Sequence, residues 1–122
     1  MSVHPTLRYR DPDAAITFLR DALGFTVAAA HRDDAGTVQH AELVQNGGAV
    51  LVGPRREGDR FATGRAVVYV AVDDVDAHHD RAAAAGATII MGLTDQDYGS
   101  REYAAVDAED NVWSFGTYRP AT

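Results

Sequence analysis

The chain has 122 residues, enough for one domain with a buried core, and its composition is that of an ordinary globular protein. Eleven basic and eighteen acidic residues give a formal net charge of −7, which argues against a nucleic-acid-binding surface. The absence of cysteine excludes disulfides and thiolate metal sites, and no apolar run is long enough to span a membrane. The N-terminus lacks the pattern of a signal peptide, so we expect a cytoplasmic protein.

The first half of the chain predicts one helix among four strands. Residues 3–10 alternate between apolar and polar side chains, as a half-buried strand does. Asp11 and Pro12 then suit the N-cap and first position of a helix, and Gly24 suits its left-handed end. Turns rich in Asp, Asn and Gly separate three further expected strands, at residues 25–31, 38–44 and 49–52.

The same pattern starts again after residues 54–64, a charged stretch with glycine and proline that predicts a linker. Gly92–Ser100 predicts a long loop, in which Tyr98 could close over a ligand. The expected elements of this half are a strand at 67–72, a helix at 75–85 and strands at 87–91, 101–106 and 112–115.

An offset of 62 or 63 residues relates the two halves. It places Asp11 on Asp73, Gly24 on Gly86, His40 on Tyr103, and Gly53 on Gly116. The sequence therefore predicts an α+β fold of two βαβββ modules, at about 1–53 and 65–118.

This repeat, the helix start Asp11-Pro12-Asp13, the run Leu23-Gly24-Phe25 and the closing run Asn111–Gly116 together resemble the vicinal oxygen chelate superfamily. That superfamily includes glyoxalase I, extradiol dioxygenases and the bleomycin-resistance proteins. The resemblance covers nearly the whole chain. It implies a single domain, residues 1–122, in which the two tandem sheets curl into a cup, and it implies a homodimer.

Enzymes of that superfamily hold a divalent metal with side chains from the first and last strands of both modules. Carried over by position, those places fall on His4, Leu51, Ala66 or Val67, and Ser114. Aliphatic side chains cannot ligate a metal, and a neutral serine is a poor ligand. We therefore expect no metal and no other cofactor at the family's site.

Strand alternation predicts which polar side chains face the cup. His40 and Glu42 point away from the buried Ala41, Arg8 shares the parity of His4, and Arg101 shares that of Tyr103. A cationic group beside an aromatic ring suits an anionic or planar ligand. Trp113 and Phe115 have the opposite parity to Ser114 and are expected in the core. The candidate ligand-binding residues are His4, Arg8, His40, Glu42, Tyr69, Arg101, Tyr103 and Ser114.

Three hypotheses for function remain open. The first is a metal-free protein that sequesters a small aromatic or heterocyclic molecule, as the bleomycin-resistance type does. The second is a metal-dependent lyase, isomerase or dioxygenase whose ligands have shifted to His4, His40 and Glu42, a two-histidine, one-carboxylate set. The third is metal-free acid–base chemistry by His40 and Glu42 on a bound small molecule.

A second histidine cluster, His78-His79 between Asp76 and Asp80, falls on the second expected helix. Adjacent residues on a helix point about 100° apart, so this pair cannot chelate one ion. We interpret it as part of a solvated helix face.

Overall fold

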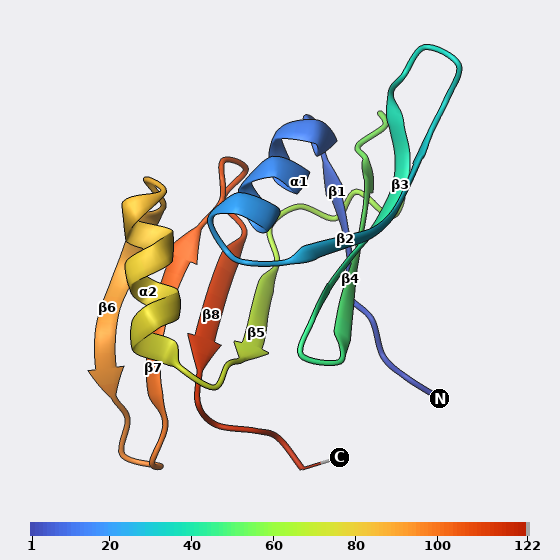
Figure 1. Ribbon diagram of the computed structural model, residues 1–122. Coiled ribbons are helices and arrows are strands. Elements are labelled where there is room, and N and C mark those ends of the chain that lie inside the picture. The colour runs from blue at the N-terminus through green and yellow to red at the C-terminus, as the bar shows by residue number, and fades with distance from the viewer. Residues whose placement is uncertain (122) are drawn as a thin grey trace. The chain divides into compact units, whose positions relative to one another are not determined.

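The computed structural model describes residues 1–121 and shows two compact units, Met1–Gly64 and Arg65–Thr122 (Figure 1). Each unit is one βαβββ module, described here by itself. The predicted α+β fold of two tandem modules is confirmed. No helix among residues 1–121 has the length and apolar character needed to cross a membrane.

Module one is a four-stranded sheet with one helix against it. The sheet order is β1-β4-β3-β2, with β1 and β4 parallel and the other pairs antiparallel. α1 contacts all four strands. The elements are β1 (Thr6–Tyr9), α1 (Pro12–Asp21), β2 (Thr26–Arg32), β3 (Val38–Gln45) and β4 (Gly48–Pro54).

Module two repeats this arrangement with the order β5-β8-β7-β6, and again only the first and last strands are parallel. α2 packs on β6 and β7. The elements are β5 (Val67–Ala71), α2 (Val75–Ala84), β6 (Thr88–Asp95), β7 (Arg101–Val106) and β8 (Val112–Gly116).

An aspartate starts each helix, Asp11 in module one and Asp74, rather than the aligned Asp73, in module two. Asp11 accepts a hydrogen bond from the Ala14 amide at 3.0 Å, and Asp74 accepts one from Ala77 at the same distance. Gly24 follows α1 in the left-handed region, with φ +77°, where side chains other than glycine are strained. The predicted helix boundaries follow from these local signals.

The segment predicted as a loop, Gly92–Ser100, begins as strand, so the loop is shorter than predicted. β6 continues through Asp95, which lies opposite Arg101, and the turn is short. The Gln96 amide donates to Ser100 O at 2.7 Å, and Gly99 has φ +85°. Ile89, Met91 and Leu93 alternate with more exposed neighbours along β6, which is the pattern of a strand that continues past Met91.

Each sheet has one side covered by its helix. In β3, Ala41 and Leu43 are fully buried on the covered side, and in β8 the predicted core residues Trp113 and Phe115 are fully buried too. Ser114 points to the opposite side. We call the side of each sheet that its own helix leaves uncovered the helix-free face.

Candidate functional site

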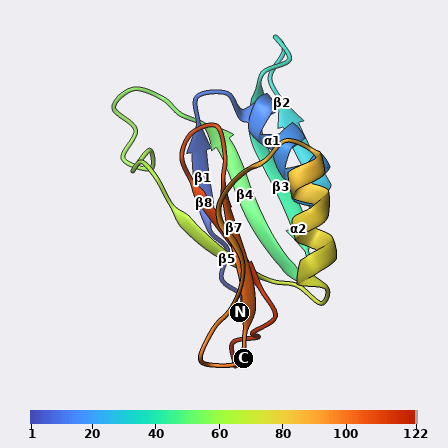
Figure 2. The same cartoon turned by 90° about the vertical axis from the view of Figure 1, so that its left-hand side faces the viewer.

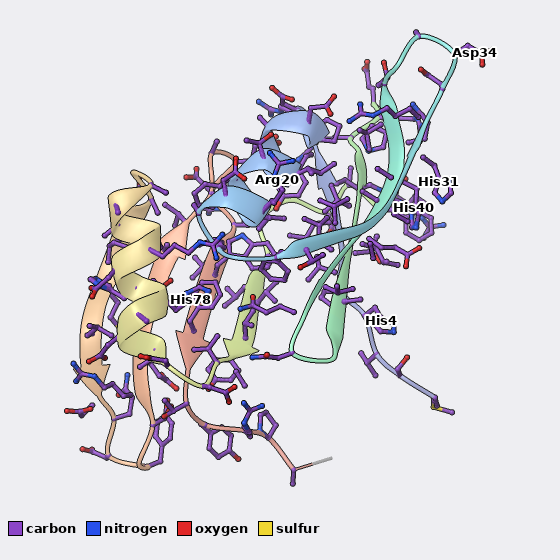
Figure 3. All side chains as sticks on the ribbon, in the orientation of Figure 1. His4, Arg20, His31, Asp34, His40 and His78 are labelled. Carbon is purple, nitrogen blue, oxygen red and sulfur yellow. The ribbon has the colours of Figure 1, made fainter. Side chains whose placement is uncertain are left out.

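Two of the predicted residues, His40 and Glu42, lie on the helix-free face of module one. His40 Nε2 is 3.8 Å from Glu42 Oε2, and both side chains are about two-fifths exposed. His31 from the neighbouring strand stacks on His40, with ring centroids 6.0 Å apart (Figure 3). The sheet alternation brings these groups together, as expected for residues two apart on a strand.

His4 lies outside this group, on the segment before β1 (Figure 3). Its Nδ1 atom is 3.3 Å from the carbonyl oxygen of Ala49, and its Nε2 atom is 2.7 Å from the Ser2 hydroxyl. Among residues 1–121, no group of three or more His, Cys, Asp or Glu side chains is placed to hold a metal ion. His4, His40 and Glu42 therefore do not form the shifted ligand set that the sequence left open.

The residues at the family's metal positions do not fit a divalent ion either. Leu51 lies opposite Thr6 and Glu42 in the sheet, and Val67 is three-quarters exposed at the start of β5. Aliphatic side chains at two of the four places leave too few donors for such a site.

Arg8 is held within its own module. Its guanidinium lies over Gly53, where a Cβ would come within 2.6 Å of Nη1. Its Nε atom is 3.7 Å from Asp59 Oδ2, and its Cζ atom is 5.6 Å from the centre of the Phe61 ring. Arg8 thus joins β1 to the segment after β4, a contact that the sequence did not predict.

Arg101 and Tyr103 share a face, but it is the face that α2 covers, so their predicted orientation is wrong. Tyr103 is fully buried and stacks on Phe115, with ring centroids 5.2 Å apart. Burial raises the pKa of its phenol well above the ordinary value. Arg101 pairs with Asp76 of α2 at 2.7 Å and with Asp95 at 3.2 Å.

The register of the two sheets explains this error. Glu42 lies opposite Leu51 in module one, and Ala104 lies opposite Ser114 in module two. The last strands of the modules are therefore offset by 63 residues, whereas β3 and β7 are offset by 62.

With the offset of 62, the counterpart of His40 is Glu102 rather than Tyr103. A shift of one residue along a strand moves every side chain to the other side of the sheet. The repeat was correctly recognised, but the offset of 63 that placed His40 on Tyr103 reversed the two faces of β7.

Glu102 is the functional candidate that the sequence analysis missed. It lies opposite Gly116, is only 7% exposed, and accepts a hydrogen bond from the Tyr98 hydroxyl, which is 2.9 Å from each carboxylate oxygen. A Cβ at Gly116 would come within 2.7 Å of both Glu102 Cγ and the Tyr69 hydroxyl. Glycine at this position therefore lets Tyr69 and Glu102 converge on the helix-free face of module two.

Tyr69, one of the predicted residues, extends this cluster. Its hydroxyl donates to the carbonyl oxygen of Tyr118 at 2.6 Å. Burial raises the pKa of Tyr69, and the negative charge of Glu102 acts in the same direction. The hydrogen bond to Glu102 raises the pKa of Tyr98. Both phenols are thus neutral hydrogen-bond donors at pH 7.

Two exposed aromatic rings border the same carboxylate. The rings of Tyr98 and Tyr118 meet edge to face, with centroids 6.1 Å apart, and are 62% and 49% exposed. Ser114, another predicted residue, lies opposite Tyr69 on the same side of the sheet. We call the group formed by Tyr69, Tyr98, Glu102 and Tyr118 the tyrosine–glutamate cluster.

His78 is not on a solvated helix face, so that interpretation is wrong for this residue. It points from α2 towards β8 (Figure 3), and its ring centroid is 4.2 Å from that of Phe115. Its Nδ1 atom shares a hydrogen bond of 2.5 Å with the Tyr103 hydroxyl, and His79 meets the Tyr103 ring edge-on. These histidines cover the buried tyrosine.

Comparison with known proteins places this chain in a family. Residues 2–115 match the family model of the Glyoxalase/Bleomycin resistance protein/Dioxygenase superfamily. The chain belongs to this superfamily. The uncharacterized protein Mb0911c of Mycobacterium bovis is 30% identical over 94% of this chain and 82% of its own length.

Solved structures agree with this family membership. The crystal structure of TioX from Micromonospora sp. ML1 is 34% identical, covers 100% of this chain and 99% of its own, and superposes with a TM-score of 0.82. TnmS3 from Streptomyces sp. CB03234, described as an antibiotic binding protein, is 18% identical with a TM-score of 0.74. It covers 94% of this chain and 96% of its own, and this likeness shows the shared fold.

Proposed function

We propose that this superfamily member binds a small aromatic or heterocyclic molecule on the helix-free face of module two, without the metal of the family's enzymes. The tyrosine–glutamate cluster carries the proposal, because it places fixed polar groups beside exposed aromatic rings. The description of TnmS3 as an antibiotic binding protein supports a sequestering role for this fold. The expected homodimer remains part of the proposal and can be checked by analytical ultracentrifugation.

The cluster favours a planar ligand that carries hydrogen-bond donors. Glu102 supplies an acceptor in a nearly buried position, where a hydrogen bond is stronger than in water. Tyr98 and Tyr118 expose ring surface on which a flat molecule can pack. Tyr69 adds a phenol held in place by Tyr118 O.

Thermal-shift screening against aromatic antibiotics and metabolites tests the proposal, with calorimetry on each compound that stabilises the protein. We expect Tyr69→Phe and Glu102→Gln to weaken binding at least tenfold. Arg101→Gln is the control, since Arg101 lies on the face that α2 covers. Elemental mass spectrometry should find no stoichiometric metal in the bound complex. Equal affinity in all three variants would contradict the assigned site.

The pair formed by His40 and Glu42 favours a second candidate function, acid–base chemistry on a small molecule bound at the helix-free face of module one. The two side chains are 3.8 Å apart and both are partly exposed, so a ligand can reach them. This function predicts conversion of the bound compound that survives a chelator and is lost in His40→Gln. Recovery of the unchanged compound after prolonged incubation would rule it out.

A further inference from the structure

A concave pocket of about 500 Å³ lies between the end of β1 and the segment that follows β4. Figure 2 shows that segment as a long green loop beyond β4. No member of the tyrosine–glutamate cluster lines the pocket. Its lining residues are Arg10, Arg55, Arg56, Glu57, Gly58, Asp59 and Ala62.

Strand topology gathers the arginines at this place. β1 and β4 run parallel, with Tyr9 opposite Pro54, so both strands end at the same edge of the sheet. The Arg55 amide donates to Tyr9 O at 2.7 Å, which fixes Arg55 beside the residue that follows Tyr9. Arg10 and Arg55 therefore leave the sheet next to each other.

The segments around this pocket carry a net positive charge, whereas the whole chain is negative. Residues 8–10 and 55–65 contain six arginines and only two acidic residues, in a protein with a net charge of −7. Every basic residue of the chain is an arginine, whose planar fork matches the oxygens of a phosphate or carboxylate. The arginines are Arg8, Arg10, Arg55, Arg56, Arg60 and Arg65.

Among residues 1–121, neither Arg55 nor Arg56 forms an ion pair. Asp59 accepts from the Phe61 amide at 2.9 Å and lies 3.7 Å from Arg8 Nε. Arg56 donates to the neutral side chain of Gln39. Within the same described residues, the buried Nε atom of Arg8 has no hydrogen-bond acceptor. The pocket thus holds guanidinium groups that can accept another anion.

We propose that this pocket, the arginine groove, binds the phosphate dianion of a small phosphorylated molecule. Arg10, Arg55 and Arg56 surround the phosphate, and the volume exceeds what inorganic phosphate alone needs, so an organic group fits beside it. Glu57 and Asp59 also line the pocket and disfavour ligands of higher negative charge. The groove acts independently of the aromatic-ligand site.

Titration of ¹⁵N-labelled protein with phenyl phosphate, followed through arginine Nε–H signals, tests this proposal. Benzyl alcohol serves as the neutral comparison and sodium chloride as the ionic-strength comparison. We expect phenyl phosphate to shift the signals of Arg10, Arg55 and Arg56, and neither comparison to do so. Inorganic phosphate should compete for the same signals.

Two double variants distinguish a specific phosphate site from general electrostatic attraction. Arg55→Gln with Arg56→Gln should weaken phenyl phosphate binding at least tenfold. Arg20→Gln with Arg119→Gln removes the same charge elsewhere, from pairs with Asp21 and Asp73, and should change it less than twofold. Equal losses in the two double variants, or no saturable binding in the unmodified protein, would overturn the proposal. Fluorescence of the single tryptophan checks that each variant is folded.

Discussion

The Tyr98 hydroxyl lies 2.9 Å from each carboxylate oxygen of Glu102, so an exposed ring covers a nearly buried negative charge. A buried carboxylate is costly unless hydrogen bonds satisfy it. Among residues 1–121, the Tyr98 hydroxyl is the hydrogen-bond donor that Glu102 has. Tyr98 closes over a residue of its own module, in the place where the sequence suggested a cover for a ligand.

Tyr98→Phe should destabilise the protein, because it removes the donor and leaves the carboxylate in place. In a Glu102→Gln background Tyr98→Phe should lower the free energy of unfolding much less, since a neutral amide is easier to bury than a carboxylate. Urea unfolding of the four proteins gives the coupling between the two residues. A coupling indistinguishable from zero would show that the hydrogen bond is absent in solution.

Alkaline pH should destabilise the protein through Tyr103. Burial raises the pKa of this phenol in the folded state above its value in the unfolded chain. Both states are protonated at pH 8, so no stability is lost there. Above about pH 10 the unfolded state releases its proton first, and the free energy of unfolding falls as pH rises.

Urea unfolding at pH 8 and at pH 11 measures this effect. Tyr103→Phe removes the titrating group and should show a smaller loss of stability between these two pH values. An equal loss in the two proteins would assign the alkaline effect to other groups. The comparison between pH values separates titration from the hydrogen bond that Tyr103 shares with His78.

Gly116→Ala should cost about 1–3 kcal/mol of stability, because the added methyl overlaps both Glu102 Cγ and the Tyr69 hydroxyl. Gly92→Ala in β6 is a matched control, since a Cβ there meets nothing within 4 Å. Chemical denaturation of both variants checks the prediction. Equal losses of stability in the two variants would contradict the predicted clash at Gly116.

Asp107→Ala should lower the free energy of unfolding by about 3 kcal/mol, because it leaves several buried donors without an acceptor. Asp107 is 5% exposed and accepts from the amide of Asn111 at 3.0 Å and from Trp113 Nε1 at 3.1 Å. The chain has one tryptophan, so its emission reports this site directly. We expect a lower unfolding midpoint and altered emission; an unchanged midpoint would contradict the assigned role.

Short-range sequence signals predicted the helices and strands well. Asp11 and Asp74 cap the two helices, and Gly24 adopts the left-handed conformation after the first. Trp113 and Phe115 are in the core as their alternation indicated. These features depend on residues a few positions apart, which a single sequence displays.

Features that depend on strand register could not be predicted in the same way. Tyr103 and Glu102 exchanged faces because β3 and β7 are offset by 62 residues while the last strands are offset by 63. The contact of Arg8 with Asp59 depends on the path of the chain after β4. The parallel pairing of β1 with β4 places Arg8 beside Gly53, and the segment after β4 then brings Asp59 close to it.

Among residues 1–121, every strand pair joins two strands from the same half of the chain. The strand pairing therefore does not depend on which of the two modules comes first in the chain. A circular permutant that begins at Arg65, with a flexible spacer joining the original ends, would keep all six paired ladders. Each half of the chain therefore carries the complete strand pairing of its own sheet.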